Sequence, residues 1–137
     1  MNFDNEFVRK AEVFLFTEAR LLDDRRFEEW LALFSERGIY WIPARPDQVD
    51  PFGEVSIAYE DRQLIDVRVR RLNHPENYAD QPAVRTRRVI GNVMIERADD
   101  AIVVVRSNFT LSDFRGEEQR VFYGEYVHTL QPVGDSF

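Results

Sequence analysis

Apolar and polar residues alternate with a helical period in the first part of the chain and with a period of two in the last part. Apolar residues recur at helical spacing from Phe7 to Leu22, which predicts an amphipathic helix of roughly four or five turns. Between residues 86 and 130, alternation with a period of two predicts three long consecutive strands, separated by turns at Asp99-Asp100 and around Gly116. Helices followed by an antiparallel meander indicate the α+β class.

Shorter elements are expected between these two parts. Asp23 or Asp24 can cap a second helix that ends near Gly38, because a carboxylate accepts hydrogen bonds from the free N–H groups of a first turn. Asp61 can cap a third helix, which His74-Pro75 ends. Short strands are expected at residues 39–42 and 56–59, with a loop between them.

Polar residues lie inside the three long strands, which suggests a sheet surface that meets another chain. The period of two fixes which residues share a face. In the third strand, Tyr126 and His128 share one face and oppose Tyr123 and Glu125. In the second strand, Arg106 and its alternate neighbours oppose a face that contains Ser107 and Phe109. In the first strand, the same rule places Val89, Gly91, Val93 and Ile95 on one face.

Composition narrows the class of protein. The chain of 137 residues has the length of one domain, and its 44% hydrophobic content is sufficient for a packed core. No apolar run is long enough to cross a bilayer, and no signal peptide is visible, so a cytoplasmic protein is expected. The chain has no cysteine, which excludes disulfides, thiolate zinc sites and cysteine-held iron–sulfur clusters.

Both the net charge and the ratio of arginine to lysine are unusual. The net charge is −7, which disfavours binding to nucleic acid, because affinity there comes mainly from neutralised phosphates. Lys10 is the only lysine among 18 basic residues, so the other 17 are arginine. Arginine forms bidentate pairs and tolerates partial burial, which suits ion pairs between subunits. High genomic GC content, which favours arginine codons, is the alternative explanation.

The two histidines, His74 and His128, are the starting point for any catalytic hypothesis. No spacing joins them into a metal site with a carboxylate, so no metal ligand is predicted. His128 shares a strand face with Tyr126, and paired with Asp61 or Glu18 it could abstract a proton in a lyase or isomerase. The structural alternatives are a satisfied core histidine, a helix cap at Asp61 and a helix-edge carboxylate at Glu18.

A group of arginines on the strands supports a different hypothesis. A solvated strand edge is the simpler explanation, but cross-strand charge pairs stabilise a sheet by only about 0.2–1 kcal/mol each. An interface with a partner, with Arg106 paired to Glu125 or Glu96, explains arginines in mid-sheet better. A homo-oligomeric binding module without chemistry is a further possibility. The predicted subunit-interface residues are Arg85, Arg87, Arg88, Arg106, Tyr123 and Glu125.

Several runs of residues resemble one known family over roughly residues 5 to 135. The chain is similar to the β (small) subunits of aromatic-ring-hydroxylating dioxygenases, and the order and spacing of the runs make the set specific. The matching runs are Glu18-Ala19-Arg20-Leu21-Leu22-Asp23, Phe27-Glu28-Glu29-Trp30-Leu31-Ala32-Leu33-Phe34, Tyr40-Trp41-Ile42-Pro43, Tyr59-Glu60-Asp61-Arg62-Gln63-Leu64, Arg70-Arg71-Leu72, Arg85-Thr86-Arg87-Arg88-Val89-Ile90-Gly91-Asn92-Val93, Arg106-Ser107-Asn108-Phe109 and Tyr123-Gly124-Glu125-Tyr126.

The resemblance implies a fold and a set of partners. The fold would be a single α+β domain over residues 1–137, with N-terminal helices packed in a strongly curved, mainly antiparallel sheet. This is the cone-shaped barrel of nuclear transport factor 2, scytalone dehydratase and ketosteroid isomerase. The resemblance also implies self-association as a trimer and assembly with three large α subunits. The α subunit would hold a Rieske [2Fe-2S] cluster and a mononuclear non-haem iron, and this chain would hold no cofactor or metal.

The chain departs from the family pattern in two places. Ala83-Val84 stands where the family often has Pro-Ser, and a local effect is expected. Family members usually continue beyond Phe137 with a final apolar strand, of which Phe137 resembles the first residue. The sequence is therefore expected to be shortened there, because a missing last strand would leave its neighbour with unpaired backbone groups.

Overall fold

The computed structural model describes residues 3–45, 47–52, 56–74, 84–133 and 137. Pro75, which was expected to end the third helix, the departure at Ala83 and the residues just before Phe137 lie outside this range. The chain forms two compact units, Met1–Arg25 with Pro82–Phe137, and Arg26–Gln81. Among the described residues, no helix is both long enough and apolar enough to cross a membrane.

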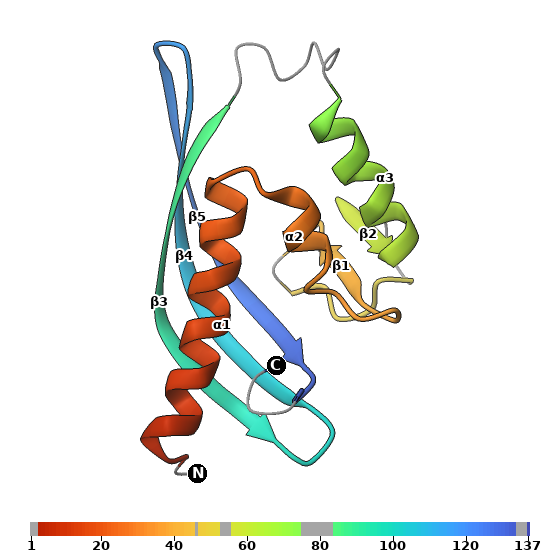
Figure 1. The fold of residues 1–137 in the computed structure, drawn as a ribbon, viewed down its shortest axis with the longest axis vertical. Helices are drawn as coiled ribbons and strands as arrows, with labels where there is room; N and C mark the ends of the chain where they lie inside the picture. Colours follow the sequence, from red (N-terminus) through yellow and green to blue (C-terminus); the bar gives the residue numbers. More distant parts are fainter. Residues whose placement is uncertain (1–2, 46, 53–55, 75–83, 134–136) are drawn as a thin grey trace. The chain divides into compact units, whose positions relative to one another are not determined.

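The first unit consists of one long helix on one three-stranded antiparallel sheet (Figure 1). The helix α1 (Asn5–Asp23) begins at Asp4, whose carboxylate accepts a hydrogen bond from the Phe7 backbone N–H at 2.8 Å. The strands β3 (Arg85–Ala98), β4 (Val103–Arg115) and β5 (Glu118–Leu130) are arranged in the order β3–β4–β5. The predicted helix, the three strands and both turns are confirmed.

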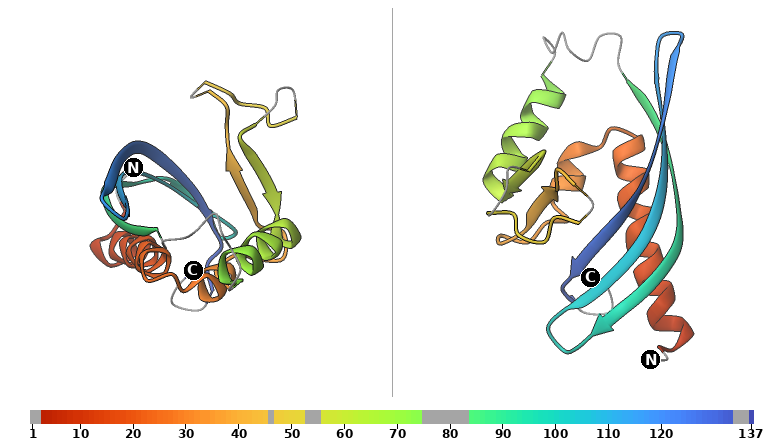
Figure 2. Two further views of the ribbon diagram at one scale, coloured as in Figure 1. Left: turned by 90° about the horizontal axis from the view of Figure 1, so that it is seen from above. Right: turned by 180° about the vertical axis from the view of Figure 1, so that it is seen from behind.

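The core of this unit lies between α1 and one face of the sheet. Figure 2 shows that the helix lies along this face. Phe7, Phe14, Ile90, Val93 and Ile95 are partly buried around this core. The helical spacing explains why α1 can contribute a continuous stripe, and alternation explains why every second strand residue joins it. The buried centre consists of Ala11, Leu15, Val103, Val105 and Leu130.

One face assignment from the sequence is wrong, and a bulge in β3 is the reason. Gly91 pairs with Asn108, but the next paired residue of β3 is Met94, which pairs with Arg106. Asn92 and Val93 therefore lie opposite the single residue Ser107, and Asn92 has a positive φ of 49°. Beyond the bulge the alternation is therefore shifted. Val89 and Met94 are exposed, whereas Val93 and Ile95 pack against the core.

The second unit contains two helices and a two-stranded antiparallel sheet. Its elements are α2 (Phe27–Leu31), β1 (Ile39–Ile42), β2 (Ala58–Asp61) and α3 (Arg62–Asn73). Trp30 is 4% exposed and makes edge-to-face contacts with Phe34 and Tyr40. Asp61 caps α3 by accepting a hydrogen bond from the Leu64 backbone N–H at 2.9 Å, as predicted.

Three local predictions need correction. The second helix ends at Leu31 and not near Gly38. Neither Asp23 nor Asp24 caps the second helix, because α2 begins after Arg26 without a side-chain cap. Asp23 is instead the last residue of α1, and its carboxylate binds β3. The second short strand covers residues 58–61 and not 56–59. The α+β class, with N-terminal helices and antiparallel sheets, is confirmed.

Candidate functional site

A histidine and a carboxylate from opposite ends of the chain meet inside the first unit. His128 Nε2 on β5 lies 2.8 Å from Glu18 Oε1 on α1. The two side chains are 15% and 17% exposed, so water weakens their interaction less than at the surface. Glu18 reaches the strand because it lies beside the apolar stripe that places α1 on the sheet. Two members of the predicted acid–base group are therefore in contact.

Aromatic rings on β4 and β5 fix the position of His128. The Tyr126 ring meets the His128 ring edge to face, with centroids 5.4 Å apart. The Phe109 ring stacks on Tyr126 at 4.2 Å. Phe109 pairs across the strands with Gly124, and a Cβ at Gly124 would lie 2.5 Å from the Phe109 ring. A glycine is therefore required beside Phe109 for the rings to stack in this way.

The other ring nitrogen of the histidine is not available to a substrate. His128 Nδ1 is buried and has no hydrogen-bond partner in the structure. The nearby Ser107 hydroxyl, on the strand residue that pairs with Tyr126, is also buried without a partner. A general base must reach the proton that it removes. In this conformation Nε2 is held by Glu18 and Nδ1 is enclosed, so the pair joins α1 to β5.

Asp61, the other carboxylate of the acid–base hypothesis, belongs to the second unit. It lines an open pocket there, but its carboxylate is engaged as the cap of α3. Arg68 nearby has a raised pKa, because Glu60 accepts hydrogen bonds from its guanidinium at 2.8 and 3.0 Å. The residues that line the pocket are Leu31, Glu36, Asp61, Arg62, Gln63 and Asp66. No group of three or more His, Asp or Glu among the described residues could hold a metal ion.

Arg88, one of the predicted interface residues, is bound inside its own unit. Its guanidinium donates to Asp23 Oδ1 at 2.7 Å, and its backbone N–H donates to Asp23 Oδ2 at 2.9 Å. The Thr86 hydroxyl donates to the same carboxylate at 2.9 Å. Asp23 is 8% exposed in its side chain and therefore fastens the end of α1 to the start of β3. Sequence reasoning missed this role, although a charged pair at a helix end is a signal that could have suggested it.

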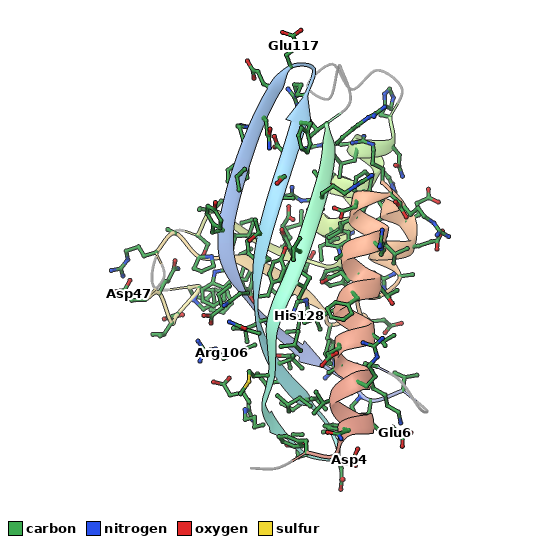
Figure 3. All side chains as sticks on the ribbon, turned by 90° about the vertical axis from the view of Figure 1, so that its left-hand side faces the viewer. Asp4, Glu6, Asp47, Arg106, Glu117 and His128 are labelled. Carbon is green, nitrogen blue, oxygen red and sulfur yellow. The ribbon has the colours of Figure 1, made fainter. Side chains whose placement is uncertain are left out.

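The remaining predicted interface residues lie on the sheet face that points away from α1. Arg106 donates to the Glu125 carboxylate from Nε and Nη2 at 2.8 to 3.0 Å, and its Nη1 lies 3.8 Å from Glu96 Oε1. This confirms the predicted cross-strand pairing of Arg106. Arg106 and His128 lie on adjacent strands (Figure 3), but on opposite faces, because Arg106 pairs with Val127. Tyr123 is 79% exposed.

Large apolar side chains accompany these charged residues on what we call the outward face. Val89, Met94 and Val127 are 68%, 67% and 61% exposed. Gly91 adds a gap, since a Cβ built there would have no atom within 4 Å. The register aligns three rows across the sheet. The rows of the outward face are Val89–Thr110–Tyr123, Gly91–Asn108–Glu125 and Met94–Arg106–Val127.

Several known proteins are similar to the chain in sequence and in fold. Residues 17–137 match the model of the family described as ring hydroxylating beta subunit. The chain is 32% identical over 133 residues to benzoate 1,2-dioxygenase subunit beta of Acinetobacter baylyi, covering 93% of this chain and 79% of the relative. It is 36% identical over 141 residues to biphenyl 2,3-dioxygenase subunit beta of Rhodococcus jostii, covering 96% and 75%.

The solved structures agree with these relatives. The beta subunit of the benzoate 1,2-dioxygenase from Burkholderia mallei superposes with a TM-score of 0.81 and 28% identity, over 99% of this chain and 85% of that one. A putative scytalone dehydratase from Novosphingobium aromaticivorans, at 20% identity, 93% and 75% coverage and a TM-score of 0.64, shares the fold alone. The chain belongs to the family of β subunits of aromatic-ring-hydroxylating dioxygenases.

Proposed function

We propose that this β subunit is a structural, non-catalytic partner of a dioxygenase α subunit. The observation that supports this proposal most directly is the contrast between its two sheet faces. The face toward α1 holds the only histidine–carboxylate contact among the described residues, and both ring nitrogens are occupied or enclosed. The outward face presents exposed apolar and charged side chains, which is typical of a surface that meets another protein.

The catalytic metal centres are assigned to the α subunit. A Rieske cluster needs two cysteine and two histidine ligands, and this chain has no cysteine. We infer that the α subunit holds the [2Fe-2S] cluster and the mononuclear iron, and that the complex hydroxylates an aromatic compound. The α-subunit pocket then determines the substrate. The β subunit provides an α+β domain without a metal centre, and the complex works in the cytoplasm.

The outward face is the proposed subunit interface. Arg85, Arg87, Arg106, Tyr123 and Glu125 supply its charged and aromatic groups. Arg85 and Arg87 are exposed, and neither forms an ion pair with a described residue, so their guanidinium groups are available to a partner. We propose that the chain self-associates as a trimer and joins three α subunits. Arg88 contributes indirectly, by holding β3 against α1.

Co-expression with the cognate α subunit tests this function. The wild-type chain is expected to co-purify with the α subunit. Tyr123→Ala and Arg106→Ala are expected to reduce the recovered complex several-fold, either at the α subunit itself or by weakening self-association of the chain. Arg26→Ala removes an exposed pair with Glu29 in the other unit and serves as the matched control. An α subunit that assembles and is fully active alone, without ever retaining the chain, contradicts the proposal.

A second candidate function rests on the 2.8 Å contact between His128 and Glu18. In a stand-alone lyase or isomerase this pair would remove a substrate proton, a role that contributes about 10²–10⁴-fold to a rate. His128→Gln preserves a side chain that can hydrogen-bond to Glu18 but cannot act as the base. Unchanged hydroxylation by the assembled complex favours the structural role. A proton-exchange activity of the purified chain that His128→Gln abolishes would establish the second function.

A further inference from the structure

The loop between β1 and β2 exposes apolar side chains to an unusual degree. Val49 is 90% exposed, Phe52 is 81% exposed and Ile57 is 70% exposed. Single exposed apolar residues are ordinary, but three of them in one connection are a candidate contact surface. We call the described residues 43–45, 47–52, 56 and 57 the β1–β2 loop.

Polar groups inside the loop hold its shape. Gln48 is 6% exposed, and its side-chain oxygen accepts from the Ala44 backbone N–H at 2.7 Å. Its side-chain nitrogen donates to the Asp50 carbonyl and to Ser56 Oγ, both at 3.3 Å. The Trp41 indole N–H donates to the same Ser56 hydroxyl at 2.8 Å. The loop therefore buries the polar side chain of Gln48 while it displays apolar side chains beside its exposed charged ones.

Contacts within the second unit hold Phe52 in an exposed position. Its backbone N–H donates to Asp50 Oδ1 at 2.9 Å, and its ring contacts the Tyr59 ring edge to face at 5.2 Å. A side chain that is already fixed loses less conformational entropy on binding than a free one. An exposed and fixed aromatic residue is also the type that most often carries binding energy in interfaces.

The outward face of the sheet has the complementary features. Val89 and Met94 are exposed on either side of Gly91, where a partner side chain meets no atom within 4 Å of the Cβ position. The missing side chain at Gly91 leaves room for an apolar side chain between Val89 and Met94. Arg87, on the same face, donates to the Thr86 carbonyl at 2.9 Å and makes no ion pair with the described residues. On the loop, the exposed Asp47 carboxylate lies 3.5 Å from Arg45, an exposed pair that a second arginine can join from outside.

Both surfaces expose apolar side chains beside charges of opposite sign. We therefore propose that the β1–β2 loop of one copy docks on the outward face of the sheet of a neighbouring copy. The contact joins two different surfaces, so it is heterologous, and repetition generates a closed ring when the rotation permits. This inference rests on the self-association in the proposed function. It assigns the outward face to a second copy of this chain, and the α subunit must then bind elsewhere.

Cross-linking between single-cysteine variants tests the contact, since the natural chain has no cysteine. Val49→Cys and Val89→Cys leave Phe52 and Gly91 in place. One full-length variant carries a tag that changes its mass, and the two are mixed and treated with a short bismaleimide. The expected mixed dimer is at least ten times as abundant as the one formed by Val49→Cys and Glu117→Cys. Glu117 lies at the turn between β4 and β5 (Figure 3). Gly91 is far from this turn, because it pairs with Asn108, which in turn pairs with Glu125.

Sedimentation of the full chain gives a second test. Phe52→Ser and Gly91→Leu are each expected to raise the dissociation constant of self-association at least tenfold. Both sites are exposed, so the unfolding midpoint should change little, and the only contact that Phe52→Ser is expected to remove within the chain is the one with the Tyr59 ring. Leu64→Ser, which removes a half-exposed apolar side chain from α3, is the matched control and should have no effect.

The outcomes separate this inference from the proposed function. If the wild-type chain self-associates but the Val49 and Val89 variants cross-link no more than the control pair, the docking inference is wrong and the trimer stands. If Val89→Cys cross-links to a co-expressed α subunit instead, the outward face belongs to that subunit and the inference is also wrong. Failure of the chain to co-purify with the α subunit bears on the proposed function alone.

Discussion

The Phe109 ring covers Gly124 across the β4–β5 pair. A Cβ at Gly124 would lie 2.5 Å from both Cε1 and Cζ of Phe109, so no other residue can occupy this position without moving the ring. The same ring stacks on Tyr126, which in turn contacts His128. One glycine therefore supports the sequence of contacts that positions the histidine.

Gly124→Ala is expected to destabilise the first unit by about 1–3 kcal/mol, because Phe109 must leave its position and disturb Tyr126. Chemical unfolding of the two proteins measures the difference. Gly91→Ala is the matched control, since its Cβ would meet no atom within 4 Å. It should be neutral or slightly stabilising. Equal losses for the two glycine variants would show that Phe109 does not determine the effect.

The contact between Glu18 and His128 should appear as a coupling energy. A double-mutant cycle with Glu18→Ala and His128→Ala is expected to give about 1–2 kcal/mol, the order of magnitude of a part-buried side-chain hydrogen bond. Unfolding free energies of the four proteins supply the cycle. Arg9 and Glu12, an exposed pair at 3.3 Å on the same helix, should give only about 0.2–0.5 kcal/mol. A coupling no larger than this would contradict the structural role of His128.

Removal of the Asp23 carboxylate should be more costly than removal of any surface charge. Asp23→Ala leaves the part-buried Arg88 guanidinium and the Thr86 hydroxyl without their acceptor, so a loss of about 3 kcal/mol is expected. Thermal or urea unfolding measures the loss. Glu29→Ala breaks the exposed pair with Arg26 and should cost at most about 1 kcal/mol. Similar values for the two variants would rule out Asp23 as the fastening of α1 to β3.

The sequence predicted the elements of the first unit because local patterns determine them. The strands end at the turn at Asp99 and at Gly116, which has a positive φ of 61°. The period of two predicts which residues of β4 and β5 share a face. The bulge at Asn92 was missed, since asparagine tolerates a positive φ without requiring it. One missed bulge was sufficient to place Val93 on the wrong face.

The contacts of the site required tertiary information. Glu18 and His128 are 110 residues apart in sequence, and Asp23 and Arg88 are 65 apart. The sequence could nominate His128 and several carboxylates, but only the packing of α1 on the sheet selects Glu18. The same packing directs Asp23 to Arg88, where the sequence had suggested a helix cap. Local propensity cannot predict which side chains form these contacts, because they depend on how the helix face packs on the sheet face.

The turn between β3 and β4 should contribute a pH-dependent part of the stability. The backbone N–H groups of Ile102 and Ala101 donate to the Asp99 carboxylate, and these hydrogen bonds lower its pKa from the ordinary value of 3.8. A carboxyl whose pKa is lower in the folded state than in the unfolded state stabilises the fold above the unfolded pKa. That contribution disappears as the pH falls through the folded pKa.

Asp99→Asn retains an oxygen that accepts both hydrogen bonds but cannot ionise. The variant should therefore be less stable than the wild type at pH 6 and should approach it as the pH falls below about 3.8. Urea unfolding of both proteins across this range measures the convergence. Asp100→Asn is the control, because its side chain accepts no hydrogen bond from the described residues, and its difference from the wild type should not follow this pattern. A constant difference between Asp99→Asn and the wild type at every pH would mean that the charge of Asp99 does not strengthen the turn.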